Sequence, residues 1–561
     1  MGNHMNYKQE YSRWLRHADA ETVKELKTIE QEEEQIKESF STNLSFGTAG
    51  LRGIVGAGTN RMNIYTVARA SQGLANYINR RYFDGSIAIS YDTRIMSEEF
   101  AKTAAGVFAA NGIKVFQYRE QMPTPCLSYA VRRLNCSAGV MITASHNPAQ
   151  YNGYKVYDSD GCQITDEAAK EISDEIEKVD AFTDVHAVLF DEGGEKGNIS
   201  YIHESVFTDF TEEIKGRSVL YGEKEDKNVA VVYTPLNGTG LKPVLRVLKE
   251  GGFTNVTIVQ EQAEPDGSFR TCPYPNPESK EAMKLGLSYA QKCHADLILA
   301  TDPDCDRIGI AVKCGQEFKL LTGNEVGLLL LEYICEQRTK HCKMPKNPIM
   351  IKSIVTTDLA EKLAESYGVK TINVLTGFKY IGELIGTLER EGKADSYIFG
   401  YEESCGYLSG AYVRDKDAVN AAYMICEMFS YYKTMGIGLM EKLQEIYRIY
   451  GYCLNTVHSF VFEGIAGFEK MQWIMKSFRN FEARSIGGLK IQDSVDYLRG
   501  IDGLPKSDVI KFNLASDCSI IVRPSGTEPK LKIYISVRAD NKETAVSIEK
   551  QIMKELESLI K

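Results

Sequence analysis

The chain carries Ile87-Ala88-Ile89-Ser90-Tyr91, a helical stretch at 97–110, and then Ile113-Lys114-Val115-Phe116. Two short apolar runs on either side of a helix predict a β-α-β unit. The same order returns at 229–259 and again at 349–374. Because such units connect parallel strands through right-handed crossovers, they predict three α/β domains with mixed, largely parallel sheets.

The last part of the chain has a different pattern. Two apolar runs at 518–522 and 531–537 flank a Gly/Pro loop, and a helix is predicted at 542–559. Neighbouring strands followed by a helix predict a smaller α+β domain. We expect four domains, at residues 1–204, 205–318, 319–452 and 453–561. Residues 6–40 are predicted to form a charged helix with few apolar positions, as an appendage to the first domain.

Composition excludes several classes of protein. The net charge is −10, whereas nucleic-acid and membrane-surface proteins need basic surface. The 13 cysteines form no Cys-x-x-Cys pairs, which favours a reducing compartment over a disulfide framework or a zinc site. No apolar run approaches the roughly 18 residues of a membrane span. We therefore expect a cytoplasmic protein with no nucleic-acid, membrane or obligatory protein partner.

Parallel α/β sheets bind ligands beyond the carboxyl ends of their strands. A buried-strand pattern at 138–142 leads into Thr143-Ala144-Ser145-His146-Asn147-Pro148. A serine hydroxyl at the end of a strand can act as a nucleophile, although these six residues alone are more typical of a polar turn that caps a helix. Lys155 lies ten residues downstream and adds a cation that can neutralise a phosphate.

A second loop, Asp302-Pro303-Asp304-Cys305-Asp306-Arg307, follows an apolar strand at 296–300. Three carboxylates at alternate positions repel one another unless a cation binds them, and magnesium prefers oxygen ligands. An EF-hand is excluded, because Arg307 and Lys313 occupy its glycine and glutamate positions. A phosphatase with an aspartate nucleophile is a rival interpretation, although Asp306 stands where its motif usually has Thr or Val.

Two further loops carry weaker signals. Gly400-Tyr401-Glu402-Glu403-Ser404 offers a carboxylate and a hydroxyl that can both hydrogen-bond a sugar, but alone it is most often surface. Arg523-Pro524-Ser525-Gly526-Thr527-Glu528-Pro529 can cradle a phosphate, or form a plain hairpin turn. The chain has neither a Walker A loop nor a Gly-x-Ser-x-Gly elbow.

The string Thr-Ala-Ser-His-Asn-Pro, followed by Tyr151-Asn152-Gly153-Tyr154-Lys155, resembles the active-site loop of the α-D-phosphohexomutase superfamily. The four motifs occur in the family's order, one per domain, over about residues 40–540. The resemblance implies a central cleft with a phosphoserine and magnesium. It assigns phosphoserine to Ser145, metal binding to Ser145, Asp302, Asp304 and Asp306, sugar contacts to Glu402 and Ser404, and phosphate binding to Arg523, Ser525, Gly526 and Thr527. It also places Arg52, in Gly47-Thr48-Ala49-Gly50-Leu51-Arg52-Gly53, near the phosphoserine, and Lys379 near the substrate.

The versions Phe46-Gly47-Thr48-Ala49-Gly50-Leu51-Arg52-Gly53 and Gly-Tyr-Glu-Glu-Ser resemble the phosphoglucomutase and phosphopentomutase branch. This implies interconversion of glucose 1-phosphate and glucose 6-phosphate, with glucose 1,6-bisphosphate as intermediate and activator. Phosphopentomutase is the alternative, followed by phosphomannomutase and glucose-1,6-bisphosphate synthase. Cys405-Gly406-Tyr407 replaces the ending typical of phosphomannomutases, and the retained Ser145 and aspartates disfavour a non-catalytic scaffold.

The general base stays open among Lys155, Arg52 and His146. Lys155 can serve if burial and neighbouring cations depress its pKa. Because water must be kept from a phosphoserine, we expect the C-terminal domain to close over the cleft as a lid.

Overall fold

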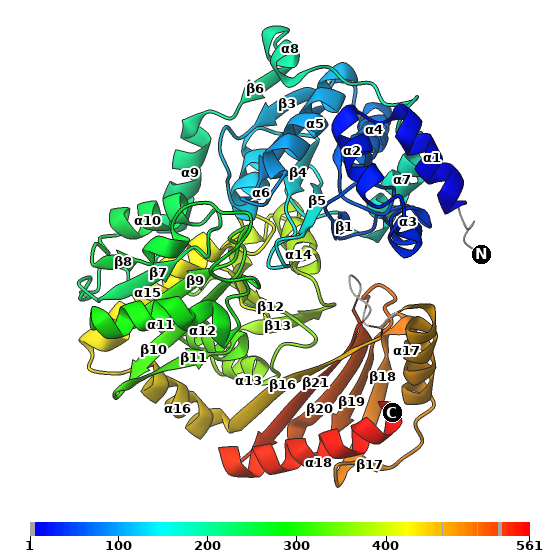
Figure 1. The fold of residues 1–561 in the computed structure, drawn as a ribbon. Helices are drawn as coiled ribbons and strands as arrows, with labels where there is room; N and C mark the ends of the chain where they lie inside the picture. The colour runs from blue at the N-terminus through cyan, green and yellow to red at the C-terminus, as the bar shows by residue number, and fades with distance from the viewer. Residues whose placement is uncertain (1–5, 463, 502, 526–529, 561) are drawn as a thin grey trace.

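The computed structural model describes residues 6–462, 464–501, 503–525 and 530–560. In these residues, four β-sheets follow one another along the chain, and we call each sheet with its helices a domain, I to IV (Figure 1). The predicted fold class, three α/β domains and a C-terminal α+β domain, is confirmed. The predicted boundaries at 204/205, 318/319 and 452/453 each fall within an element, α9 (Glu204–Lys215), β11 (Glu317–Leu321) and β16 (Tyr452–Val461), and the division into domains stays a prediction.

Domain I contains the first of the predicted β-α-β units, at residues 87–116. β2 pairs in parallel with β3 and with β4, while β5 runs antiparallel to β4 and to β1. The sheet order is β1-β5-β4-β2-β3-β6. Its elements are β1 (Leu51–Ile54), α4 (Ile64–Arg81), β2 (Ser86–Tyr91), α5 (Ser97–Ala110), β3 (Lys114–Gln117), α6 (Thr124–Arg133), β4 (Ala138–Ile142), β5 (Tyr151–Tyr157), α7 (Asp166–Glu177), α8 (Phe190–Glu195) and β6 (Ile199–Tyr201).

Domain II has the sheet order β11-β10-β9-β7-β8. β7 is parallel to β8 and β9, as the second unit predicts, and β10 is antiparallel to both its neighbours. Its elements are α9 (Glu204–Lys215), β7 (Val231–Thr234), α10 (Leu241–Glu250), β8 (Val256–Ile258), α11 (Lys280–Lys292), β9 (Leu297–Thr301), β10 (Ile308–Cys314) and β11 (Glu317–Leu321).

Domain III has the order β13-β12-β14-β15, in which β12 is parallel to both its neighbours and β15 is antiparallel to β14. Its elements are α12 (Gly323–Lys340), β12 (Ile349–Ser353), α13 (Leu359–Ser366), β13 (Lys370–Val374), α14 (Phe378–Arg390), β14 (Tyr397–Glu402), β15 (Gly406–Leu408), α15 (Ala418–Thr434) and α16 (Leu439–Tyr450).

Domain IV is an antiparallel sheet of order β16-β21-β20-β19-β18-β17 with two helices packed on it (Figure 1). The predicted pair of strands and the closing helix are confirmed as β20, β21 and α18. The elements are β16 (Tyr452–Val461), α17 (Gly464–Arg479), β17 (Ser485–Ile486), β18 (Leu489–Asp496), β19 (Ile510–Leu514), β20 (Cys518–Pro524), β21 (Lys530–Ala539) and α18 (Lys542–Ile560).

Residues 6–40 are helical, as predicted, but they form three short helices rather than one, and these pack on domain I. They are α1 (Tyr7–His17), α2 (Ala20–Thr28) and α3 (Glu33–Phe40). Trp14 and Phe40 are buried and stack edge to face, and Trp14 also packs against Tyr65 and Phe182 of domain I. The few apolar residues are sufficient because each helix turns them toward one small shared core.

The apolar core is divided unequally among the domains. One continuous cluster of buried side chains runs through domains I, II and III, whereas domain IV has a cluster of its own. Between domains III and IV lies a smaller cluster, formed by Ile354, Val355, Leu375, Tyr497, Val509, Ile521 and Tyr534. Among the described residues, no helix combines the length and the hydrophobicity that crossing a bilayer requires.

Candidate active site

The predicted loops of all four domains meet at one cleft of about 710 Å³. Most of the predicted site residues line it: Arg52, Ser145, His146, Lys155, Asp306, Lys379, Glu402, Ser404, Arg523 and Ser525. Asp302 and Asp304 lie directly behind this lining, buried. Gly526 and Thr527 lie outside the described residues.

Ser145 stands at the carboxyl end of the buried strand β4. Its Oγ donates a hydrogen bond to Oδ2 of Asp302 at 2.9 Å and lies 3.2 Å from Nδ1 of His146. Its backbone is left-handed, with φ of 53°, a conformation that costs a non-glycine residue free energy. The loop therefore holds the hydroxyl in one place at the expense of backbone strain.

Asp302, Asp304 and Asp306 form a buried group after β9. One carboxylate oxygen from each lies within 4.8 Å of the others. Burial, and then the carboxylates of Asp304 and Asp306, hold the pKa of Asp302 well above its usual range. Oδ1 of Asp304 and Oδ1 of Asp306 are buried without a hydrogen-bond partner among the described residues. An all-oxygen donor set with unsatisfied acceptors fits a hard divalent cation, so the three residues form a candidate metal site.

Lys155 and His146 border this acidic group. Nζ of Lys155 lies 2.7 Å from Oδ2 of Asp304 and 3.6 Å from Oδ2 of Asp306. Burial lowers the pKa of Lys155, but the two carboxylates outweigh burial and raise it above its ordinary value. Burial and the cations Arg307 and Arg52 hold the pKa of His146 well below its ordinary value. These surroundings favour the protonated form of Lys155 and the neutral form of His146.

Glu402, the last residue of β14, links the two predicted loops of domain III, which are residues 376–379 and 400–404. Its Oε1 accepts a hydrogen bond from the backbone nitrogen of Gly377 at 2.7 Å. Gly377 has φ of 122°, which an L side chain rarely adopts, so glycine is required at this turn. Nζ of the following Lys379 lies 3.3 Å from Oδ1 of Asp166, in domain I. Glu402, Ser404 and Lys379 therefore face the same cleft.

Domain IV contributes Arg523, near the end of β20. Its Nη2 donates to the hydroxyl of Tyr534 at 3.2 Å, and its guanidinium lies 5.7 Å from the centre of that ring. The ring is buried in the small cluster between domains III and IV. A planar guanidinium supported in this way is suited to binding a phosphate with two parallel hydrogen bonds.

Family models match all four domains in order. Those of the phosphoglucomutase/phosphomannomutase alpha/beta/alpha domains I, II and III match residues 43–182, 208–315 and 322–450, and that of the C-terminal domain matches 492–554. The chain belongs to the phosphoglucomutase/phosphomannomutase family.

Relatives in this family match nearly the whole chain. A phosphoglucomutase of Staphylococcus saprophyticus is 39% identical, covering 94% of this chain and 96% of its own. A phosphoglucomutase of Staphylococcus aureus is 38% identical, covering 94% and 95%. Among solved structures, the open form of pp63/parafusin, a phosphoglucomutase of Paramecium, is 19% identical with a TM-score of 0.69 over 92% of this chain and 95% of its own, which shows the shared fold.

Sequence reasoning missed Lys416 and gave Arg307 no role in this phosphoglucomutase/phosphomannomutase cleft. Nζ of Lys416 lies 3.3 Å from Oδ2 of Asp306 and 3.2 Å from Oδ1 of Asp415. Nη1 of Arg307 lies 3.1 Å from Oε1 of Glu278. The available signal for Lys416 was the run of charges Arg414-Asp415-Lys416-Asp417 between β15 and α15, in which Lys416 is partly buried and the other three residues are buried.

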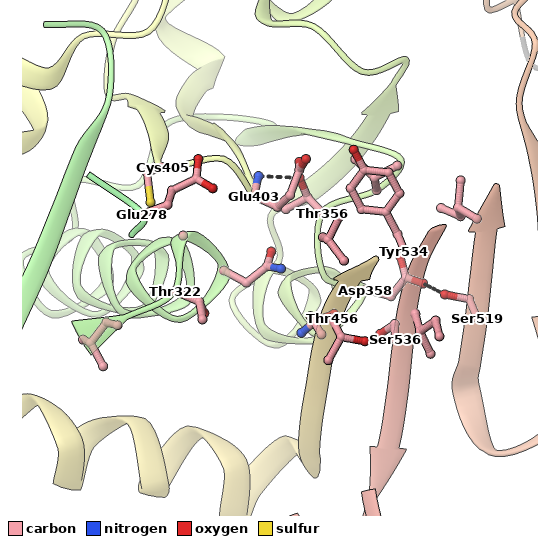
Figure 2. A pocket seen from close by; sticks show the side chains of 18 of the residues that line it. Glu278, Thr322, Thr356, Asp358, Glu403, Cys405, Thr456, Ser519, Tyr534 and Ser536 are labelled. Atoms are coloured by element: carbon pink, nitrogen blue, oxygen red, sulfur yellow. Dashed lines mark hydrogen bonds between the residues drawn. The ribbon is translucent and has the colours of Figure 1, made fainter. Parts of the chain in front are cut away.

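A second cavity of about 420 Å³ lies between domains II, III and IV (Figure 2). Its lining combines apolar side chains such as Ile354 and Ile521 with Thr356, Asp358 and Ser519. Neither Ser145 nor any of the three aspartates contributes to it. The second cavity adjoins the candidate active site, because Glu278, Glu403, Val457 and Tyr534 line both.

Proposed function

We propose that this chain is a phosphoglucomutase, which interconverts glucose 1-phosphate and glucose 6-phosphate through phosphorylated Ser145 and glucose 1,6-bisphosphate. The observation that carries the proposal is the 2.9 Å hydrogen bond from Ser145 Oγ to Asp302. It joins the candidate carrier oxygen of domain I to the candidate metal site of domain II. Relatives named phosphoglucomutase, 38–39% identical over almost the full length, support the same assignment.

The reaction transfers one phosphoryl group in each direction. The bond between phosphorus and Ser145 Oγ breaks, Oγ keeps the electron pair, and phosphorus bonds to the free sugar hydroxyl, which gives up its proton. The bisphosphate then reverses its orientation, and its other phosphoryl group returns to Oγ. Such transfers depend mainly on positioning and on neutralisation of negative charge.

We assign the neutralisation to the acidic group and its neighbours. Asp302, Asp304, Asp306 and phosphorylated Ser145 would hold Mg²⁺, which would supply positive charge beside the transferring phosphoryl group. Lys155 and Arg52 add fixed cations on the domain I side. Burial and the neighbouring cations keep the His146 ring neutral, so it can accept a proton, but its lowered pKa makes it a weak base; no single general base is assigned among Lys155, Arg52 and His146.

The remaining residues hold the sugar. Glu402 and Ser404 would hydrogen-bond ring hydroxyls in both orientations, and Lys379 would contact the substrate from the same domain. Arg523 and Ser525, with Gly526 and Thr527, would bind the phosphate that is not reacting. Because Arg523 belongs to the domain with a separate core, closure of domain IV would complete the site and exclude water.

The carrier assignment is tested by labelling. The protein is incubated with glucose 1,6-bisphosphate carrying labelled phosphate, and the phosphopeptide is mapped. We expect the label on Ser145 and loss of steady turnover in Ser145→Ala; label on another residue would refute the carrier. Comparing turnover of glucose 1-phosphate, mannose 1-phosphate and ribose 1-phosphate tests the substrate, since faster turnover of the pentose would replace this proposal with a phosphopentomutase.

A further inference from the structure

A clamp of side-chain hydrogen bonds holds the backbone of the loop that presents Ser145. Arg94, in the turn between β2 and α5, has a fully buried side chain. Its Nη1 donates to the carbonyl oxygens of Pro148 and Tyr151, both at 2.9 Å, and its Nη2 donates to those of Ser145 and Asn147. One guanidinium thus binds four carbonyls of the short connection between β4 and β5.

A second contact fixes the other side of Ser145. The backbone nitrogen of Ser145 donates to Oγ1 of Thr143 at 2.8 Å. The same hydroxyl donates to Oδ2 of Asp92 at 2.6 Å, and that oxygen lies 3.2 Å from Nε of Arg94. The nitrogen and the carbonyl of Ser145 are therefore tied to one buried network of Asp92, Arg94 and Thr143.

Domain II closes the network from outside. The ring of Phe269 lies over the Arg94 guanidinium, 5.0 Å from its central carbon. A Cβ atom at Gly267 would come within 2.4 Å of the backbone nitrogen of Ile95, so the domain II loop lies against the turn that carries Arg94. The clamp is thus packed between the domain that bears the serine and the domain that bears the aspartates.

The network keeps the strained backbone of Ser145 from relaxing. A left-handed serine relaxes unless its surroundings hold it, and relaxation would move Oγ away from Asp302. Thr143 holds the residue at its nitrogen and Arg94 holds it at its carbonyl. Lysine cannot replace Arg94, because its three donors radiate from one atom and cannot span four carbonyls as a planar fork does.

We propose that Arg94 and Thr143 are positioning residues that hold Ser145 Oγ in the geometry required for phosphoryl transfer. Neither side chain is assigned contact with the sugar or the metal; both act through the backbone of Ser145. The inference rests on the proposed function for its kinetic consequence. Its structural consequence, a rigid 145–151 loop, is measurable without any turnover.

The test compares five proteins: wild type, Thr143→Val, Thr143→Ser, Arg94→Lys and the control Arg69→Lys. Arg69 is a partly buried arginine of the same domain whose Nε donates to the carbonyl of Val179, away from the loop. Thr143→Val keeps the shape and removes the hydroxyl, while Thr143→Ser keeps the hydroxyl. Measurements are kcat and KM for glucose 1-phosphate, and hydrogen exchange of loop 145–151 in the unphosphorylated protein.

We expect Thr143→Val and Arg94→Lys to lower kcat by about 100-fold, the cost of a small misplacement of reacting atoms, with KM changed less than about threefold. Loop exchange should accelerate at least tenfold in both. Thr143→Ser should recover most of the lost rate, and Arg69→Lys should match wild type. Wild-type loop exchange in Thr143→Val would overturn the clamp.

The outcomes separate the two proposals. If loop exchange accelerates as expected but wild-type Ser145 takes no label from glucose 1,6-bisphosphate, the clamp stands and the proposed function fails. If Ser145 is labelled but Thr143→Val retains wild-type kcat, the function stands and the positioning role is refuted. Should Arg94→Lys fail to fold, the Thr143 pair decides alone.

Discussion

Nζ of Lys155 in β5 of domain I lies 2.7 Å from Oδ2 of Asp304 in domain II. Both side chains are buried, so solvent screens the attraction between their charges only weakly. It joins domain I, which bears the candidate carrier Ser145, to domain II, which bears the candidate metal site. Removing one partner of such a pair leaves a buried charge uncompensated, which is costly.

Replacing Lys155 with Met should therefore lower kcat by about 100-fold, because one positive charge is lost beside the transferring phosphoryl group. Steady-state kinetics with glucose 1-phosphate give this value. Lys170→Met, an exposed lysine of α7, is the matched control and should behave as wild type. Equal kcat in the two variants would show that Lys155 takes no part in charge neutralisation.

Metal removal should abolish turnover and lower the melting temperature, because three buried carboxylates then repel one another. Mg²⁺ should restore both. Asp306→Asn removes one charge, and we expect the half-saturating Mg²⁺ concentration for activity to rise at least about tenfold. Activity that survives exhaustive chelation would rule out a metal role for this group.

Arg523→Ala should raise KM for glucose 1-phosphate by about 30-fold, since a hydrogen-bonded charge contributes about 2 kcal/mol of binding. The control is Arg484→Ala, an exposed arginine of the same domain. Labelling of Ser145 by the bisphosphate should persist in both variants. An unchanged KM in Arg523→Ala would place the phosphate elsewhere.

Glu427 provides a pH-dependent test of the core. Burial raises the pKa of its carboxyl to about 6, although Val219 and Tyr333 donate hydrogen bonds to Oε1. A carboxyl whose pKa is higher in the folded protein stabilises the fold at low pH, and this contribution disappears as pH rises through 6. Glu427→Gln lacks that ionisation.

The free energy of unfolding of wild type, minus that of Glu427→Gln, should therefore fall by about 2 kcal/mol between pH 4.5 and pH 7. Urea unfolding of both proteins at several pH values measures the difference, and groups that titrate in both proteins cancel. A difference that stays constant across this range would mean that Glu427 keeps its ordinary pKa.

The parallel units of domains I to III were predictable because their central strands are buried on both faces. β2 and β7, for example, are nearly continuous apolar runs. In domain IV the sequence revealed β20 and β21 but missed β18, where half of the side chains are exposed, none is fully buried, and the apolar signal is lost. For residues 6–40 the sequence predicted one helix instead of three, because each of the three contributes only one to three buried side chains and the apolar pattern is weak.

The motif loops were predictable because each follows a strand and combines unusual side chains. Lys416 was not, since its partner Asp306 lies in another domain and no spacing in the sequence links them. Arg94 was harder still, because its partners are backbone carbonyls, which leave no trace in the amino-acid pattern. Sequence motifs thus identified the groups that face the cleft and overlooked those that support them.

The separate core of domain IV has a consequence for heating. Ser145, the candidate carrier, and the three aspartates belong to a block with one continuous interior. Arg523 belongs to a unit that is joined to this block by a small apolar cluster and by ion pairs such as Lys511 with Asp358. Warming should loosen this attachment before the block melts. The protein would then bind the substrate more weakly while Ser145 is still phosphorylated. Hydrolysis of the phosphoserine would then be faster than isomerisation.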